Sequence, residues 1–168
     1  MENLYKELRS FFANDMDLND LFDSEAIIWI DWREYDEDVV RYFNDMMDEP
    51  IDIKTVSNGK PYGDDIVLKN GNKELQIPYG DEQDRDVTIK YFNDFVKPDY
   101  EVRWFAESLG NDTLGFTVLS GAEWANLEDE FGADTVRYYF EPINLESNMF
   151  NLDMDEVSAL LELRENNR

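Results

Sequence analysis

Forty Asp and Glu side chains accompany only fifteen Lys and Arg in this chain of 168 residues, which gives a formal net charge of −25 at pH 7. Like charges repel one another in a compact state, so the chain folds only if a large apolar core offsets that repulsion. Apolar residues make up 42% of the chain and aromatic residues 14%, which distinguishes it from an acidic disordered segment. We therefore expect one folded domain, residues 1–168, with a substantial core and an acidic surface.

The charge also limits the kinds of partner that the protein can bind. A surface of this sign repels nucleic acid, anionic membranes and acidic metabolites, and it attracts basic surfaces. The first residues lack the basic and apolar regions of a signal peptide, and no apolar run reaches the roughly 18 residues that span a bilayer. We expect a cytoplasmic protein that binds a basic protein, with no direct contact to nucleic acid or membrane. Adaptation to high salt also produces acidic proteins and is an alternative explanation.

The absence of histidine and cysteine removes most catalytic and metal-binding chemistry. Ser-His-Asp sites, Cys-His sites and the usual zinc sites are impossible within this one chain. Gly59-Lys60 resembles the end of a phosphate-binding loop. However, Lys54 stands where that loop begins with glycine, and Pro61 replaces its hydroxyl residue. The acidic segment that starts at Asp15 lacks the glycine and the final glutamate of a calcium loop. We therefore expect no enzymatic activity, no cofactor and no metal.

Hydrophobic periodicity predicts a mixed order of helices and strands. Helices are expected at 2–13, 36–48, 84–97, 120–132 and 153–164, with one further turn near residue 18. Strands are expected at 26–32, 51–56, 65–69, 73–79, 100–105 and 115–119, and a short segment at 135–140 connects the last two helices. Asn70-Gly71 between two strand-like runs is typical of a hairpin turn, and Ser120 with Glu123 predicts a capping box. The order indicates an α+β fold with helices packed on a mainly antiparallel sheet.

The sequence contains two similar segments that are offset by 49 residues. This offset aligns Tyr42-Phe43-Asn44-Asp45 with Tyr91-Phe92-Asn93-Asp94. Both segments predict a helix followed by two strands, which indicates an internal repeat of residues 38–69 and 87–119. Two such units side by side would extend one sheet, with Phe43 and Phe92 buried at equivalent positions beneath it. Chance similarity between two amphipathic helix–strand pairs is the alternative explanation.

Two clusters of carboxylates stand at the entries to the helices expected at 36–48 and 84–97. They form the candidate partner-binding surface, which comprises Asp31, Trp32, Glu34, Tyr35, Asp36, Glu37, Asp38, Asp81, Glu82, Asp84 and Asp86. Trp32 and Tyr35 are the expected anchors, because an aromatic side chain ringed by carboxylates suits a partner rich in Lys and Arg. For Asp84 or Asp86 alone, a favourable place in the first turn of a helix is a sufficient explanation.

The stretch from Arg103-Trp104-Phe105 to Gly115-Phe116, and on through Glu123-Trp124, resembles small bacterial immunity proteins of polymorphic and contact-dependent toxin systems. The compact size, the acidity and the lack of cysteine are similar as well. The likeness covers about the second half of the chain and carries over no functional residue. It implies an inhibitor that captures one toxin, such as a basic nuclease, by occluding its active site.

A nucleic-acid mimic is the alternative function, acting as an anti-restriction or anti-CRISPR inhibitor of a DNA-binding defence protein. Such a mimic places carboxylates where phosphates lie, at about one per 1.7 Å of duplex axis. Here basic residues interrupt the acidic clusters, which favours a local acidic patch over a long rail of charge. The two functions remain open at the level of sequence.

Overall fold

The computed structural model describes residues 2–31, 33–60, 63–79, 84–111 and 113–166. Its helices are α1 (Glu2–Phe12), α2 (Leu18–Phe22), α3 (Asp36–Asp45), α4 (Arg85–Val96), η1 (Ala106–Ser108), α5 (Gly121–Phe131), α6 (Ala133–Tyr139) and α7 (Met154–Asn166). Its strands are β1 (Ile28–Asp31), β2 (Asp52–Lys60), β3 (Gly63–Asn70), β4 (Lys73–Gln76), β5 (Tyr100–Phe105), β6 (Thr113–Ser120) and β7 (Phe140–Pro142). The prediction of an α+β fold with antiparallel strands is confirmed. None of the described helices has the length and apolarity needed to cross a bilayer.

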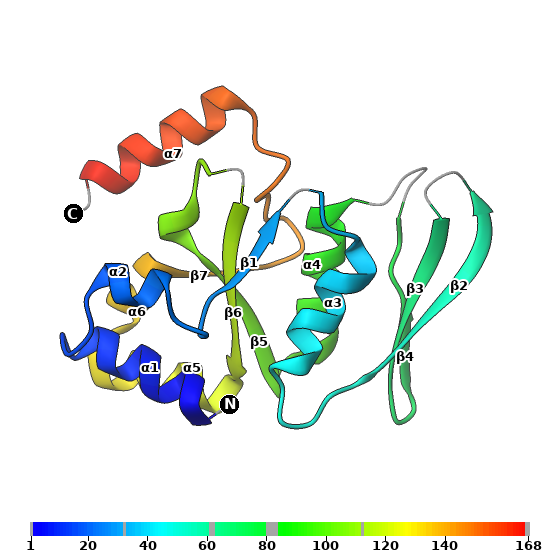
Figure 1. Ribbon diagram of the computed structural model, residues 1–168, viewed down its shortest axis with the longest axis horizontal. Helices are drawn as coiled ribbons and strands as arrows, with labels where there is room; N and C mark the ends of the chain where they lie inside the picture. The colour runs from blue at the N-terminus through cyan, green and yellow to red at the C-terminus, as the bar shows by residue number, and fades with distance from the viewer. Residues whose placement is uncertain (1, 32, 61–62, 80–83, 112, 167–168) are drawn as a thin grey trace.

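The elements form four layers, because two separate sheets lie on opposite sides of the helix pair α3 and α4 (Figure 1). The larger sheet has the strand order β1-β6-β5-β7, and the smaller sheet has the order β2-β3-β4. Helices α1, α2, α5 and α6 cover the remaining face of the larger sheet (Figure 1). The larger sheet is therefore covered by helices on both faces.

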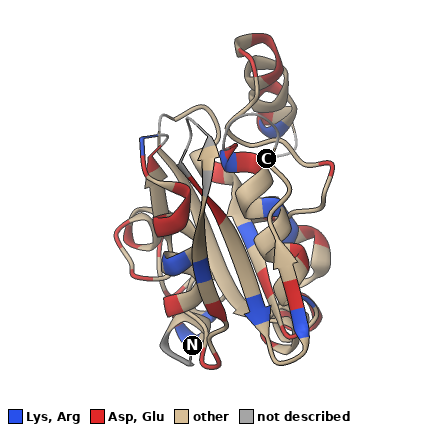
Figure 2. Cartoon of the chain, turned by 90° about the vertical axis from the view of Figure 1, so that its right-hand side faces the viewer, with Lys and Arg blue, Asp and Glu red and all other residues tan. Residues whose placement is uncertain are grey.

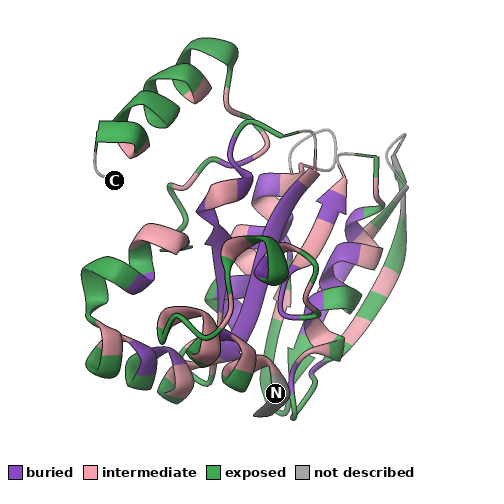
Figure 3. Cartoon of the chain, turned by 60° about the vertical axis from the view of Figure 1, so that its left-hand side comes forward, coloured by how far each residue is buried: buried purple, intermediate pink, exposed green. Residues whose placement is uncertain are grey.

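The central strands of the larger sheet contribute side chains to two cores. In β5, Val102 and Trp104 pack toward α3 and α4, whereas Phe105 packs toward α1, α5 and α6. In β6, Val118 and Leu119 divide between the two cores in the same way. Successive side chains of a strand point to opposite faces, so β6, which is buried on both sides, is apolar almost throughout. Figure 3 shows the resulting continuous burial along these strands.

The smaller sheet buries only the face that packs on α3 and α4. Ile66 and Leu68 of β3 are buried, while Val56 on the neighbouring β2 is half exposed. Asn70 pairs with Lys73 at the end of the β3–β4 hairpin, so the two loop residues are Gly71 and Asn72. Gly71 has φ = 61°, the conformation that a tight hairpin turn with glycine at its first loop position requires.

Both halves of the predicted repeat form a helix followed by an antiparallel strand pair, α3-β2-β3 and α4-β5-β6. The aligned residues Asn44 and Asn93 also have similar contacts. The Oδ1 atom of each accepts a backbone N–H from the chain that follows its helix, at Ile51 and Val102 respectively, at 2.8 Å in both cases. These contacts agree with duplication, which itself stays a prediction.

The expectation that the two units extend one sheet is wrong. Strands β2 and β3 belong to the smaller sheet, whereas β5 and β6 belong to the larger one. Phe43 and Phe92 are both fully buried, and their ring centroids are 5.6 Å apart between the two sheets. Strand β1 pairs with the edge of β6 at which the other unit would have extended the sheet. The smaller sheet instead covers the opposite side of the helix pair.

Candidate partner-binding surface

The negative charge is unevenly distributed along the chain and over the fold. Residues 52–76, which contain the smaller sheet, carry four acidic and four basic residues. Residues 15–38 carry ten acidic residues against one arginine, and residues 141–165 carry seven against one. Figure 2 shows blue and red interspersed over the side that displays the smaller sheet. The excess of carboxylates therefore lies on the larger-sheet side of the fold and on the C-terminal segment.

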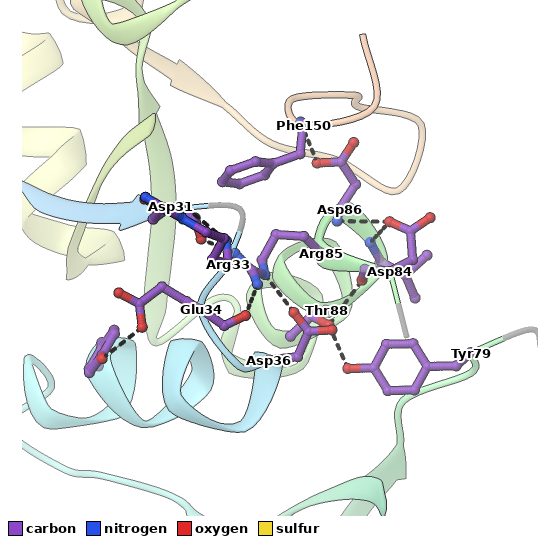
Figure 4. A network of polar contacts seen from close by, with 12 residues as sticks. Asp31, Arg33, Glu34, Asp36, Tyr79, Asp84, Arg85, Asp86, Thr88 and Phe150 are labelled. Atoms are coloured by element: carbon purple, nitrogen blue, oxygen red, sulfur yellow. Dashed lines mark hydrogen bonds and ion pairs between the residues drawn. The ribbon is translucent and has the colours of Figure 1, made fainter. Parts of the chain in front are cut away.

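The described residues of the two predicted acidic clusters lie close together, and Arg85 joins them (Figure 4). Its Nε donates to Asp36 Oδ1 at 2.5 Å, and its Nη1 donates to the Asp31 carbonyl oxygen at 2.6 Å. Its Nη2 donates to the carbonyl oxygen of Glu34. One guanidinium from the start of α4 therefore fixes both the end of β1 and the first residue of α3.

Asp36 is not available to a partner, which corrects the sequence-based assignment. The residue is 5% exposed, and its carboxylate is the counter-ion of Arg85, whose side chain is 10% exposed. Two opposite charges taken out of water must compensate each other, because an unpaired buried charge is strongly destabilising. Asp36 therefore holds the acidic loop in place and contributes no exposed charge. Sequence reasoning missed this because its partner lies 49 residues away.

Asp86 is also buried, at 1% exposure, so it is not a surface contact either. Its carboxylate accepts the backbone N–H groups of Met149, Phe150 and Asn151 at 3.1, 2.8 and 3.0 Å. Asp84 caps α4, and its carboxylate accepts hydrogen bonds from the Asn151 side-chain amide at 2.9 and 3.1 Å. Both carboxylates thus anchor the segment that leads to α7.

The residues that stay accessible form a compact surface at the start of α3. It comprises Glu34, Tyr35, Glu37, Asp38 and Tyr42, which we call the tyrosine–carboxylate surface. Tyr35 is 77% exposed and Tyr42 is 38% exposed. The Tyr42 hydroxyl donates to Glu34 Oε2 at 3.2 Å, and desolvation together with Glu34 raises the pKa of Tyr42. Tyr42 is one turn along from Asp38 on the same helical face, a spacing from which the sequence could have identified it.

Salt bridges compensate part of the charge around this surface. Arg41 forms an i,i+4 ion pair with Glu37 at 3.0 Å. Arg33 contacts both carboxylate oxygens of Asp31, and these hydrogen bonds lower the pKa of Asp31. Exposed pairs of this kind contribute little to stability. Asp31 therefore lies at the margin of the surface, with its charge partly compensated.

Three of the predicted contact residues, Trp32, Asp81 and Glu82, lie outside the described residues. Of the remaining eight, Glu34, Tyr35, Glu37 and Asp38 stay candidates for direct contact. Arg85, which organises the region, was not among the candidates. The signal that pointed to it was a single basic residue within the acidic stretch 81–86.

Outside this surface, the described structure contains open cavities but no candidate metal site. No group of three His, Cys, Asp or Glu residues is placed to hold a metal among the described residues. A cavity of about 960 Å³ is open to solvent between α2, η1 and α6. Arg137 lines this cavity, and its guanidinium already pairs with Glu128 at 3.2 Å.

Comparison of the chain with protein-family models, curated proteins and solved structures finds no match. The resemblance to immunity proteins therefore stays a prediction. A proposal about function depends on the surface itself: where the charge lies, which aromatic side chains are exposed, and what holds them in place.

Proposed function

We propose that the protein is an acidic inhibitor that binds one basic protein in the cytoplasm, such as a nuclease toxin, and occludes its active site. The observation that carries the proposal is Tyr35, which is 77% exposed inside a group of carboxylates on a chain of net charge −25. Tyrosine is enriched among the residues that dominate interface energies, and its ring also attracts cations. A Lys- or Arg-rich surface matches both features.

The contacts of Arg85 make the tyrosine–carboxylate surface suitable for tight binding. Arg85 bonds to the Glu34 carbonyl oxygen and to the Asp36 carboxylate, the two residues that flank Tyr35 where the turn meets α3. The turn is therefore ordered before a partner arrives. Binding then costs less conformational entropy than it does for a flexible acidic tail.

The charge distribution favours this proposal over a nucleic-acid mimic. A mimic of duplex phosphates needs a regular and uninterrupted line of negative charge. Here Arg33 and Arg41 interrupt the carboxylates around α3, and the smaller sheet carries balanced charge. The mimic also makes a different prediction, since it would compete directly with duplex DNA for its partner.

The test compares two variants that each remove two charges. The first is Glu34→Gln/Tyr35→Ser/Glu37→Gln on the tyrosine–carboxylate surface. The second is Asp15→Asn/Glu25→Gln, which removes two exposed carboxylates near α2. Once a basic partner has been purified, its association rate and affinity are measured for the wild type and both variants at several salt concentrations.

We expect the first variant to weaken binding by about 100-fold, which is about 2.7 kcal/mol, and the second by less than about threefold. Association of the wild type should slow steeply as salt rises, because steering is screened. Equal effects of both variants would show that only total charge matters and would refute the proposed site. Two other results would refute the inhibitor proposal. One is an association rate that does not change with salt. The other is displacement of the partner by duplex DNA together with an unchanged affinity of the variant Tyr35→Ser for that partner.

A further inference from the structure

The smaller sheet, at the right of Figure 1, ends in an open edge at β2. The strand order is β2-β3-β4, so β2 pairs with β3 on one side only. This pairing is regular from Asp52 to Ser57 and shifts before Lys60. The other edge strands of the described sheets, β1, β4 and β7, are three or four residues long. Residues 52–57, which we call the β2 edge, therefore form the longest free strand edge of the described structure.

The register of the sheet identifies which backbone groups of β2 are free. The Ile66 carbonyl oxygen accepts the Ile77 N–H at 2.9 Å, so Ile66 directs its backbone groups toward β4. Thr55 lies opposite Ile66 in β2. Opposite residues of an antiparallel pair exchange either both hydrogen bonds or neither, so the N–H and C=O of Thr55 point away from β3. By the same alternation, the backbone groups of Ile53 and Ser57 also point to the free edge.

The outward backbone groups of these three residues form no hydrogen bond with any other described residue. The side-chain cover of the edge is incomplete as well. Leu68 in the central strand is fully buried, whereas Ile53, which lies opposite it on the same face, is partly exposed. A row of unpaired N–H and C=O groups is a template for one more strand. An added strand would satisfy these groups and cover the side chain of Ile53.

The surroundings of the β2 edge are mainly negative. Residues 34–54 carry eight acidic residues against two basic ones, Arg41 and Lys54. Arg41 already forms an ion pair with Glu37. Lys54 projects from the open face of the sheet, because its neighbour Ile53 packs toward the helices. Opposite charges on neighbouring strands stabilise a sheet, so a basic segment suits this edge best, with an uncharged residue beside Lys54.

Two exposed carboxylates, those of Asp45 and Asp52, lie where the end of α3 meets the start of β2. The Asn44 side chain donates to the Ile51 carbonyl oxygen at 2.9 Å and accepts the Ile51 N–H at 2.8 Å, and Asp45 and Asp52 directly follow these two residues. Neither carboxylate forms an ion pair or hydrogen bond with another described residue. Successive residues of a strand point to opposite faces. Two consecutive basic residues of an added strand can therefore reach Asp52 on the open face and Asp45 on the helix beneath.

We infer that the β2 edge binds an extended basic segment of the protein partner, which adds one strand to the smaller sheet. The backbone of that segment pairs with Ile53, Thr55 and Ser57, and two consecutive Lys or Arg side chains pair with Asp45 and Asp52. The inference rests on the proposed function, because it takes the partner to be basic.

The position of α3 favours an extended segment of a partner over a second copy of this chain. Helix α3 carries the tyrosine–carboxylate surface and also packs against β2, so one partner can contact both sites. A second copy fits poorly, since two-fold pairing of the β2 strands would bring two acidic α3 helices together.

The probe is a short synthetic peptide in which two consecutive Lys residues precede alternating Val and Thr. Its control is the same peptide with N-methylated backbone amides, which keeps the charge and removes the donors that strand pairing needs. The edge variant is Thr55→Pro, because proline is tolerated where the N–H of an edge strand points outward. Its matched control is Gln76→Pro on the opposite edge of the sheet, where Gln76 lies opposite Val67 and its N–H also points outward. Circular dichroism verifies that each variant is folded.

Binding is measured by fluorescence anisotropy at about 0.15 M salt. We expect the wild type to bind the probe at least about tenfold more tightly than the N-methylated peptide. Thr55→Pro should weaken binding by a similar factor, and Gln76→Pro should stay within about twofold of the wild type. Asp45→Asn and Asp52→Asn should each weaken binding more than Asp15→Asn, which removes an exposed carboxylate far from β2 in the sequence.

Equal binding of the two peptides to the wild type would overturn the inference, because it would show that only charge is recognised. Sedimentation that shows a wild-type dimer, abolished by Thr55→Pro, would also overturn it by assigning the edge to a second copy.

The purified basic partner separates failure of this inference from failure of the proposed function. If Thr55→Pro leaves the affinity for the partner unchanged while Glu34→Gln/Tyr35→Ser/Glu37→Gln weakens it, the β2 edge is rejected and the proposed function stands. If neither variant changes the affinity, both are rejected.

Discussion

Replacement of Arg85 by methionine is expected to destabilise the protein by about 3–5 kcal/mol, because it leaves the Asp36 carboxylate buried without a counter-ion. The side chains of Arg85 and Asp36 are only 10% and 6% exposed, so water cannot readily take the place of the guanidinium. The carbonyl oxygens of Asp31 and Glu34 also lose their donor. A loss of this size is a large share of the roughly 5–15 kcal/mol by which domains are stable.

A double-mutant cycle separates the ion pair from the other contacts of Arg85. Asp36→Asn removes the buried charge and keeps a side chain of similar shape. In the double variant Arg85→Met/Asp36→Asn, no carboxylate remains uncompensated. We expect the double variant to be more stable than the sum of the single effects predicts, with a coupling energy of about 1.5–3 kcal/mol. Unfolding in urea at pH 7, followed by tryptophan fluorescence, gives all four free energies.

Two results would refute this reasoning. A loss below about 1 kcal/mol for Arg85→Met would show that Asp36 is solvated or otherwise compensated without the arginine. A cycle that is additive within about 0.5 kcal/mol would show that the two side chains do not depend on each other. If the first result were obtained, the argument that Arg85 orders the turn that carries Tyr35 would also fail.

Three further predictions concern other parts of the molecule. Burial raises the pKa of Glu141 above its ordinary 4.5, so the folded state binds more protons and stability falls as pH rises through the weakly acidic range. Glu141→Gln should therefore raise the unfolding free energy at pH 7 and flatten its pH dependence, and an unchanged pH profile would contradict this. Phe43→Ala and Phe92→Ala should each cost about 3–5 kcal/mol. Because their ring centroids are 5.6 Å apart, the double variant should deviate from additivity by at least about 0.5 kcal/mol in urea titrations. Raising salt from about 0.01 to 0.3 M should increase the melting temperature by screening self-repulsion, and a decrease would show that attractive ion pairs dominate.

The elements of this fold were predictable where their signals are local. The capping box of Ser120 and Glu123 is present at the start of α5, and Gly132 ends that helix with φ = 96°. Asn70-Gly71 was correctly identified as a hairpin signal, although the loop residues are Gly71 and Asn72. Helix α6 was taken for a connecting segment, because seven residues with one buried side chain, Val136, give little periodicity.

The separation into two sheets was not predictable from the same signals. Helices α3 and α4 have a sheet on each side, but the periodicity of their apolar residues does not specify how many strands cover them or which sheet those strands join. Pairing depends on contacts between distant segments, such as β1 with β6, which are more than 80 residues apart in the sequence. A pattern of helix and strands therefore predicted each unit but not how the two units assemble.

The candidate surface was predictable as a region, but the roles of its residues were not. Carboxylates are usually exposed, so Asp36 and Asp86 were assigned to the surface along with Glu34 and Glu37. Their burial follows from a long-range ion pair in one case and from three backbone N–H donors in the other. Neither arrangement has a local signature in the sequence.

The basic residues of the chain explain why so much negative charge remains available. Every arginine within the described residues pairs with a carboxylate of the chain itself: Arg9, Arg33, Arg41, Arg85, Arg103, Arg137 and Arg164. Some of these pairs, such as Arg85 with Asp36, are largely buried and position other groups. Because only fifteen basic residues accompany forty acidic ones, these pairs leave most of the carboxylates uncompensated. Mobile counter-ions must compensate the excess carboxylates of residues 15–38 and 141–165 in the free protein. A basic partner would displace those ions, and the tyrosine–carboxylate surface overlaps the first of these two segments.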